Sequence, residues 1–225
     1  MTDLKLVLFD VDGTLVDSQA AIVGAMVGAF EAVNHPLPAR DVLLSIVGLS
    51  LDKAMARLAP ELDLPTQTRM VEAYKDTYHQ HRLQTGAESM PLYPGAMEAL
   101  QALAAVPEVL LGVATGKSRR GLDALIEVHG LESYFITRQV ADDHPSKPHP
   151  SMILTAMAET GVDAGQTVMI GDTEFDMAMA ASAGVTGLGV SWGYHPAQAL
   201  HQAQRVLDGF DELPGALDAI WRQPA

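Results

Sequence analysis

The sequence predicts an α/β fold in which a doubly wound parallel sheet is interrupted by a block of helices. Four short apolar runs are nearly continuous rather than alternating with polar residues, which is typical of parallel strands buried on both faces. Helical patterns separate the last three runs, as connections between parallel strands require. Residues 18–84 depart from this rhythm, because they contain several helical patterns and no convincing strand.

The sheet elements follow one another along the chain in a regular order. The predicted strands are Leu4–Phe9, Val109–Ala114, Thr167–Ile170 and Val185–Val190. The helices predicted around the last three strands are Gly95–Ala105, Ser118–His129, Pro148–Thr160 and Glu174–Ala183. This alternation of strand and helix is the pattern of a doubly wound sheet.

The block of helices is predicted to be an insert between the first and the second strand. Its four helices are Ser18–Val33, Ala39–Ile46, Leu51–Leu58 and Thr66–Gln84, with proline-containing breaks at 34–38 and 60–65. The chain is expected to leave the core near Val16-Asp17 and to return to it near Thr85–Pro94. The alternative is that the same helices simply cover one face of the sheet.

Composition restricts the class of protein. With 225 residues, 48% of them hydrophobic, the chain is long enough for one or two domains and a sizeable core. The formal net charge of −14 argues against nucleic-acid and anionic-membrane partners. The absence of cysteine excludes disulfides, thiol catalysis and zinc–thiolate sites. Without a signal peptide or a membrane-length apolar run, a cytoplasmic protein is expected, either a monomer or a homodimer.

Polar side chains follow three of the predicted strands, and a further loop at 142–150 adds a lysine. In chain order these residues are Asp10 and Asp12, Thr115 and Gly116, Lys147, and Asp172 and Asp176. Ligands of open α/β sheets bind outside the carboxyl ends of the strands, so we expect these residues to meet at one edge of the sheet.

The residue types in this cluster favour phosphoryl transfer assisted by a metal ion. Carboxylates that are packed together repel one another and take up protons unless a cation neutralises them, and oxygen ligands suit Mg²⁺. Lys147, Thr115 and the backbone N–H groups before the helix at Ser118 are candidates for holding phosphate oxygens. One carboxylate could attack phosphorus to give an aspartyl-phosphate, while a second protonates the leaving oxygen and later deprotonates water.

The order of these residues also resembles that of the haloacid dehalogenase-like (HAD) hydrolases, particularly the phosphoglycolate phosphatase-like group. The segment Asp10-Val11-Asp12-Gly13-Thr14-Leu15 resembles the first motif of that family, and Gly171-Asp172-Thr173-Glu174-Phe175-Asp176 resembles the fourth. Thr115 is similar to the second motif, and Lys147, in Lys147-Pro148-His149-Pro150, to the third. The resemblance covers nearly the whole chain in order.

The resemblance implies a Rossmann-like core domain, at 1–16 and 86–225, with an inserted helical cap domain at 17–85 that closes over the site. It also implies a role for each matched residue. Asp10 would be the nucleophile and a Mg²⁺ ligand, and Asp12 the general acid/base with its backbone carbonyl on the metal. Asp172 would be a metal ligand, and Asp176 a ligand or an acceptor behind the metal. The phosphoryl group would be bound by Thr115, Gly116 and Lys147.

Several of these residues also have a purely structural interpretation. Asp176 could be a first-turn acid of a helix, Thr115 a helix cap and Lys147 a solvated loop lysine. Asp17 and Ser18 are expected to cap the first helix of the insert rather than to take part in catalysis.

Lys117 departs from the family's pattern, in which a small polar residue often follows the threonine of the second motif. It is expected either to add positive charge at the mouth of the site or to lie in solvent. The loop Gly48-Leu49-Ser50 resembles the family's loop for substrate specificity. The residues expected at the surface are Lys53, Arg57, His79 and His81.

Four functions are compatible with this interpretation. The first is a Mg²⁺-dependent phosphatase of a small phosphorylated metabolite, such as phosphoglycolate or a sugar phosphate. The second is a phosphomutase of the β-phosphoglucomutase type, which keeps the phosphoryl group. A dehalogenase is disfavoured, because dehalogenases of the family lack the aspartate that Asp12 provides here. A non-catalytic binding protein is disfavoured, because both Asp10 and Asp12 are present.

Overall fold

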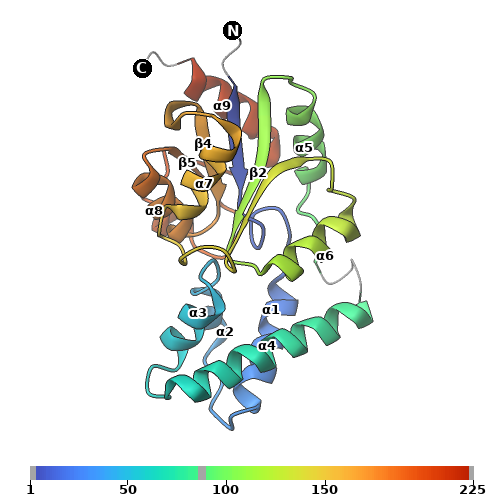
Figure 1. Cartoon of the computed structure of the whole chain (residues 1–225), viewed down its shortest axis with the longest axis vertical. Helices are drawn as coiled ribbons and strands as arrows, with labels where there is room; N and C mark the ends of the chain where they lie inside the picture. Colours follow the sequence, from blue (N-terminus) through green and yellow to red (C-terminus); the bar gives the residue numbers. More distant parts are fainter. Residues whose placement is uncertain (1–3, 86–89, 223–225) are drawn as a thin grey trace.

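The computed structural model describes residues 4–85 and 90–222, which form a parallel sheet flanked by helices and, beside it, a helical insert (Figure 1). The strands are β1 Lys5–Phe9, β2 Val109–Thr115, β3 Phe135–Val140, β4 Thr167–Gly171, β5 Thr186–Val190 and β6 Arg205–Leu207. Their order is β3-β2-β1-β4-β5-β6, and every neighbouring pair is parallel. In this doubly wound order the chain reverses direction across the sheet at β1, where a ligand crevice is expected.

Helices cover both faces of the sheet because β1 is apolar on both faces. The helices of the core are α5 Ala96–Ala104, α6 Arg119–His129, α7 Ser151–Thr160, α8 Glu174–Ala183 and α9 Leu213–Trp221, with short 3-10 helices η2 Ala164–Gln166, η3 Ala197–Ala199 and η4 Phe210–Glu212. Val7 and Phe9 belong to a hydrophobic cluster with α5, α6 and α9, whereas Leu6 and Leu8 belong to a second cluster with α7 and α8. The buried β1 side chains, each worth about 1.5–3 kcal/mol of burial, fix this strand at the centre of the core.

The insert has a hydrophobic cluster of its own. Its helices are α1 Gln19–Glu31, α2 Arg40–Leu44, α3 Leu51–Leu58 and α4 Leu64–Thr85. Met26, Phe30, Met55 and Met70 pack together in this cluster and are fully buried. These helices pack mainly on one another, which supports an insert over the alternative that they cover a face of the sheet. Figure 1 shows them, in blue and cyan, beyond the end of the sheet to which the β1 arrow points.

The structure confirms the α/β class and the four predicted strands, with small changes at their ends. It adds the edge strands β3 and β6 and the helix α9, which were not predicted. The domain boundaries at 16/17 and 85/86 stay a prediction, and the return of the insert near Thr85–Pro94 lies partly outside the described residues. None of the described helices combines the length and the apolarity needed to cross a lipid bilayer.

Candidate active site

The loop after β1 places two aspartates at the edge of the sheet because it turns sharply at Gly13. This glycine has a φ of +88°, and its N–H donates to the carbonyl of Val16 at 2.9 Å. A β-carbon at Gly13 would lie 2.2 Å from Oδ2 of Asp172, so a larger residue does not fit the turn. The loop after β1 is therefore packed directly against the loop after β4.

Three buried carboxylates meet where these two loops touch. Asp10, Asp172 and Asp176 each present an oxygen within 4.8 Å of the others, and none of them is more than 1% exposed. Asp172 accepts hydrogen bonds from Thr14 Oγ1 at 2.9 Å and from the Tyr194 N–H at 2.8 Å. The structure thus brings together residues that the sequence separates by more than 160 positions.

Lys147 joins this cluster from the loop after β3. Its Nζ lies 3.0 Å from Oδ1 of Asp10 and 2.6 Å from Oδ1 of Asp176, and the residue is buried. The interpretation of Lys147 as a solvated loop lysine is therefore wrong. Oδ2 of Asp176 accepts hydrogen bonds from the N–H and the Oγ1 of Thr173, which makes a capping box at the start of α8. Asp176 is thus both a first-turn acid and the partner of Lys147.

Burial and mutual repulsion shift the pKa values of this cluster. Burial raises the pKa of Asp10 to about 7, because desolvation of the carboxylate outweighs the attraction of Lys147, while Asp176 and Asp12 add repulsion. Burial, followed by repulsion from Asp176 and Asp10, also raises the pKa of Asp172. Desolvation opposes the charge of Lys147, but Asp10 and Asp176 outweigh it and raise its pKa. With Lys147 as its one cation among the described residues, the cluster therefore takes up protons unless a further cation neutralises its carboxylates.

The residues of the cluster fit a hard divalent cation. Both carboxylate oxygens of Asp10 are buried, and apart from the 3.0 Å ion pair between Oδ1 and Lys147 neither has a hydrogen-bond partner among the described residues. A buried carboxylate in this state is costly unless a cation neutralises it, and a donor set made only of oxygens suits Mg²⁺. Asp10 and Asp172 are the candidate ligands, and Asp176 is either a third ligand or the acceptor that holds Lys147, because its Oδ1 pairs with Lys147 while its Oδ2 accepts from Thr173.

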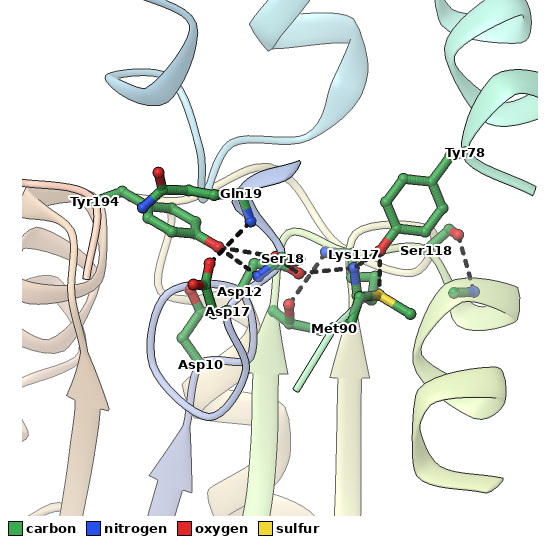
Figure 2. Close-up of polar contacts among 12 residues, drawn as sticks. Asp10, Asp12, Asp17, Ser18, Gln19, Tyr78, Met90, Lys117, Ser118 and Tyr194 are labelled. Carbon is green, nitrogen blue, oxygen red and sulfur yellow. Dashed lines mark hydrogen bonds and ion pairs between the residues drawn. The ribbon is translucent and has the colours of Figure 1, made fainter. Parts of the chain in front are cut away.

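Asp12 belongs to a separate polar network that reaches the insert (Figure 2). Its Oδ1 accepts a hydrogen bond from Ser18 Oγ at 2.5 Å and pairs with Lys117 Nζ at 2.9 Å. Lys117 also donates to the hydroxyl of Tyr78 on α4 at 3.0 Å, and its side chain is only 7% exposed. Lys117 therefore does not lie in solvent, and it lines the cavity between the core and the insert. Ser18 contacts Asp12 instead of capping α1, whereas Asp17 does accept the N–H of the first residue of that helix.

The loop after β2 places the second motif directly beneath the insert. Thr115 is buried, and its Oγ1 accepts the N–H of Lys117 at 3.2 Å. The cap of α6 is Ser118, whose Oγ accepts the N–H three residues later, so the helix-cap interpretation of Thr115 is wrong. A β-carbon at Gly116 would lie 2.6 Å from the carbonyl oxygen of Gly48 in the insert. Only glycine leaves room for the insert at this point.

A cavity of about 310 Å³ lies between the core and the insert. Of the predicted site residues, those that line it are Asp10, Asp12, Thr115 and Gly116. The remaining three, Lys147, Asp172 and Asp176, do not line the cavity but are clustered with Asp10. Gly48 and Leu49 of the predicted specificity loop line the opposite side. The insert therefore covers the edge of the sheet at which the motif residues meet.

Two further polar contacts hold the insert against the core. The N–H of Ser50 donates to Ser146 Oγ at 2.9 Å. His195 accepts the N–H of Glu174 at Nδ1, which leaves a proton on Nε2 for the carbonyl of Ser45 at 3.1 Å. Burial lowers the pKa of His195, in keeping with this neutral form.

Sequence reasoning missed most of the insert side of the cavity. The missed lining residues include Ile22 and Met26 from α1, Tyr74, Tyr78, His79 and Arg82 from α4, and Arg120 from α6. His79, expected at the surface, is half-buried and lines the cavity, whereas Lys53 and Arg57 are exposed and do not line it. The spacing of Tyr74, Tyr78 and Arg82, four residues apart on one helix face, is the signal that could have identified this wall.

Comparison with known proteins places this arrangement in a family. The sequence model described as "Haloacid dehalogenase-like hydrolase" matches residues 7–190. A protein of Dickeya dadantii named "Probable phosphatase IndB" is 39% identical over 221 residues, which cover 96% of this chain and 94% of that protein. A protein of Vibrio parahaemolyticus named phosphoglycolate phosphatase is 27% identical over 221 residues, covering 94% and 95% of the two chains.

Solved structures agree with this placement. A hydrolase from Pseudomonas syringae has a TM-score of 0.84 and 26% identity, covering 97% of this chain and 99% of its own. A β-phosphoglucomutase from Clostridium difficile has a TM-score of 0.82 with 97% of each chain covered, but its 18% identity supports only a shared fold. With the matched family model spanning most of the sequence, the chain belongs to the haloacid dehalogenase-like hydrolase family.

Proposed function

We propose that the protein is a Mg²⁺-dependent phosphatase that hydrolyses a small phosphate monoester through an aspartyl-phosphate on Asp10. The observation that carries the proposal is the state of Asp10. This buried carboxylate lines the cavity, pairs through Oδ1 with Lys147 at 3.0 Å, and keeps Oδ2 without a polar partner among the described residues. A nucleophile must present a free oxygen to its substrate, and a cation must offset its charge as the substrate phosphate approaches. The names of the two relatives support the same activity.

In this proposal, Asp10, Asp172 and the backbone carbonyl of Asp12 hold Mg²⁺. The bound ion supplies positive charge that offsets the negative charge of the carboxylates and of the phosphate oxygens. Asp176 keeps Lys147 in position, because its two oxygens are engaged by Lys147 and by the capping box. Lys147, Thr115 and the backbone beside Gly116 bind the remaining phosphoryl oxygens.

Asp10 and Asp12 divide the chemistry between them. An oxygen of Asp10 attacks phosphorus, the bond from phosphorus to the alcohol oxygen breaks, and the departing oxygen takes a proton from the carboxyl group of Asp12. Asp12, now ionised, then takes a proton from water, and the water oxygen attacks phosphorus and releases Asp10 and inorganic phosphate. Hydrogen bonds from Ser18 and Lys117 to one oxygen of Asp12 orient the carboxyl group for both transfers.

The test is release of inorganic phosphate from a panel of small phosphate esters, phosphoglycolate and sugar phosphates included, with Mg²⁺ and with EDTA. We expect turnover with Mg²⁺ only, and a loss of at least about 10⁴-fold in Asp10→Asn. Asp123→Asn, which removes the same charge from the exposed face of α6, is the matched control and is expected to keep full activity.

Two results would overturn the proposal. A phosphomutase would convert a sugar phosphate into its isomer without net release of phosphate. A folded protein that loads Mg²⁺ but turns over no ester would instead favour a non-catalytic role. The presence of Asp12 argues against a dehalogenase.

A further inference from the structure

The cavity above Asp10 is larger than a two-carbon alcohol needs. A cavity of about 150 Å³ holds one benzene ring, so about 310 Å³ has room for a phosphoryl group and a ring-sized body together. Asp10 and Asp12 line one end of this space, and Arg82 and Arg120 line it from α4 and α6. A substrate that fills the cavity therefore extends from the aspartates toward these two arginines.

The walls between the two ends are mainly apolar. Ile22 and Met26 from α1, together with Leu49 from the loop before α3, line the cavity on the insert side. Tyr74 and Tyr78 lie one turn apart on α4, with their rings 5.9 Å apart and within 18° of parallel. Such walls gain little from a short, fully hydrated alcohol, whereas they match a flat apolar body.

The far end, lined by Arg82 and Arg120, carries positive charge that has no acidic partner among the described residues. Nη2 of Arg120 lies 2.9 Å from Nε2 of His79, and Nη2 of Arg82 lies 3.4 Å from Nδ1 of the same ring. A neutral imidazole has only one acceptor nitrogen, so it satisfies at most one of the two guanidinium groups. Within residues 4–85 and 90–222, no carboxylate forms an ion pair with either arginine.

Besides Asp10 and Asp12, the acidic residue Asp142 lines the cavity, and one of its two oxygens is engaged by a backbone N–H. Oδ2 of Asp142 accepts the backbone N–H of Arg119 at 2.7 Å. The side chain of Arg119 pairs with Asp143 instead. The contrast between the paired Arg119 and its neighbour Arg120 indicates that Arg120 and Arg82 are left available for an anionic group of a ligand.

We propose that the substrate is the phosphate ester of a ring-sized, mainly apolar alcohol that carries an acidic group at the end remote from the phosphate. The proposal rests on the proposed phosphatase function, because it assigns the alcohol to the cavity above Asp10. The apolar walls bind the ring, and Arg82 and Arg120 bind the acidic group. Phosphoglycolate, with an acidic group but no body to fill the space between the two ends, is then a poor substrate.

The test compares esters that differ only in these features. Benzyl phosphate has the ring, 4-carboxybenzyl phosphate has the ring and the acid, and phosphoglycolate has the acid without the ring. We expect kcat/KM to fall in the order 4-carboxybenzyl, benzyl, phosphoglycolate, with about a tenfold step from the loss of the carboxylate contact. In Arg82→Met and Arg120→Met, the ratio of kcat/KM for 4-carboxybenzyl phosphate to kcat/KM for benzyl phosphate is expected to fall toward one. Lys53→Met, an exposed insert lysine outside the cavity, should keep the wild-type ratio.

Binding gives a second measurement that does not depend on turnover. Affinity for the non-hydrolysable 4-carboxybenzyl phosphonate is measured by calorimetry with Mg²⁺ present. We expect Arg120→Met to weaken this affinity about tenfold and to remove the advantage over benzyl phosphonate.

Different results would overturn the phosphatase function and the substrate class. Hydrolysis of phosphoglycolate as fast as the ring-bearing esters, or an unchanged ester ratio in both arginine variants, overturns the substrate class alone. Absence of hydrolysis of every ester overturns the function.

Discussion

The two ends of the cavity are built in different ways. At the phosphoryl end, loops after adjacent strands supply the residues, and Lys147, Asp172 and Asp176 each have at least two polar partners. At the alcohol end, single side chains from three helices supply apolar and basic groups, and Arg82 and Arg120 share one histidine. Charged groups that act on a transition state have to be fixed in advance, whereas apolar walls tolerate exchange of one side chain for another. The residues that act on phosphorus are therefore held in fixed positions, whereas those that contact the alcohol can be exchanged more readily.

Asp12→Asn is expected to have the largest effect on the chemical end. Without a proton donor, kcat for an alkyl phosphate should fall by about 10² to 10⁴. With 4-nitrophenyl phosphate, attack by Asp10 on phosphorus should still occur, because nitrophenolate leaves without taking a proton. Hydrolysis of the aspartyl-phosphate should remain slow, because water still lacks its base. Rapid mixing should then show a burst of about one nitrophenolate per enzyme, followed by slow turnover. Equal losses for both esters without a burst would assign Asp12 a structural role only.

The second prediction concerns the metal-free stability of the same end. The pKa of Asp10 is raised from its usual 3.8 to about 7, so between these pH values the folded protein holds a proton that the unfolded chain has released. Raising the pH through this window should therefore destabilise the metal-free fold, by up to about 4 kcal/mol, since one pKa unit is worth about 1.4 kcal/mol.

This second prediction is checked by urea unfolding in EDTA at pH 4.5 and pH 7.5. From pH 4.5 to pH 7.5 the wild type should lose more unfolding free energy than Asp10→Asn does, because asparagine does not ionise. Added Mg²⁺ should restore the wild type at pH 7.5 and have little effect on the variant. Parallel stability curves for the two proteins would show that Asp10 does not titrate in this window.

Gly116→Ala tests the junction between the two ends. The added carbon would approach the Gly48 carbonyl oxygen to 2.6 Å, so the insert has to move away from the second motif. We expect a loss of about 1–3 kcal/mol in stability and a lower kcat/KM for every ester. Gly165→Ala is the matched control, because a β-carbon there meets nothing within 4 Å. An unchanged kcat/KM in Gly116→Ala would mean that contact between the insert and the second motif does not matter for turnover.

Lys117→Met is expected to have the smallest effect, because Lys117 acts through Asp12 and not on the substrate directly. Loss of its 2.9 Å contact leaves Ser18 as the remaining donor to the same oxygen of Asp12. We expect kcat to fall about tenfold with little change in KM, and Lys117→Arg to recover part of the loss. A change in KM alone, or no recovery with arginine, would place Lys117 in substrate binding instead.

The phosphoryl end could be predicted because its residues are tied to strand ends. An apolar run such as Leu6–Phe9 marks a buried strand, and the polar residues after it must emerge at the carboxyl edge of the sheet. The order of the motifs therefore located Asp10, Thr115 and Asp172 without any knowledge of distances. The strand β6 was missed because its three residues are too few for a periodic pattern.

The sequence by itself determined the fold class, the insert and the residues gathered at the end of the sheet, because hydrophobic periodicity and chain order are local properties. Only the tertiary structure decided that Lys117 pairs with Asp12, that Ser18 contacts Asp12 instead of capping α1, and that Arg82 meets Arg120 across His79. These contacts join the core to the insert or one loop of the core to another. Their partners are chosen by how the two bodies pack, which no local pattern in the sequence records.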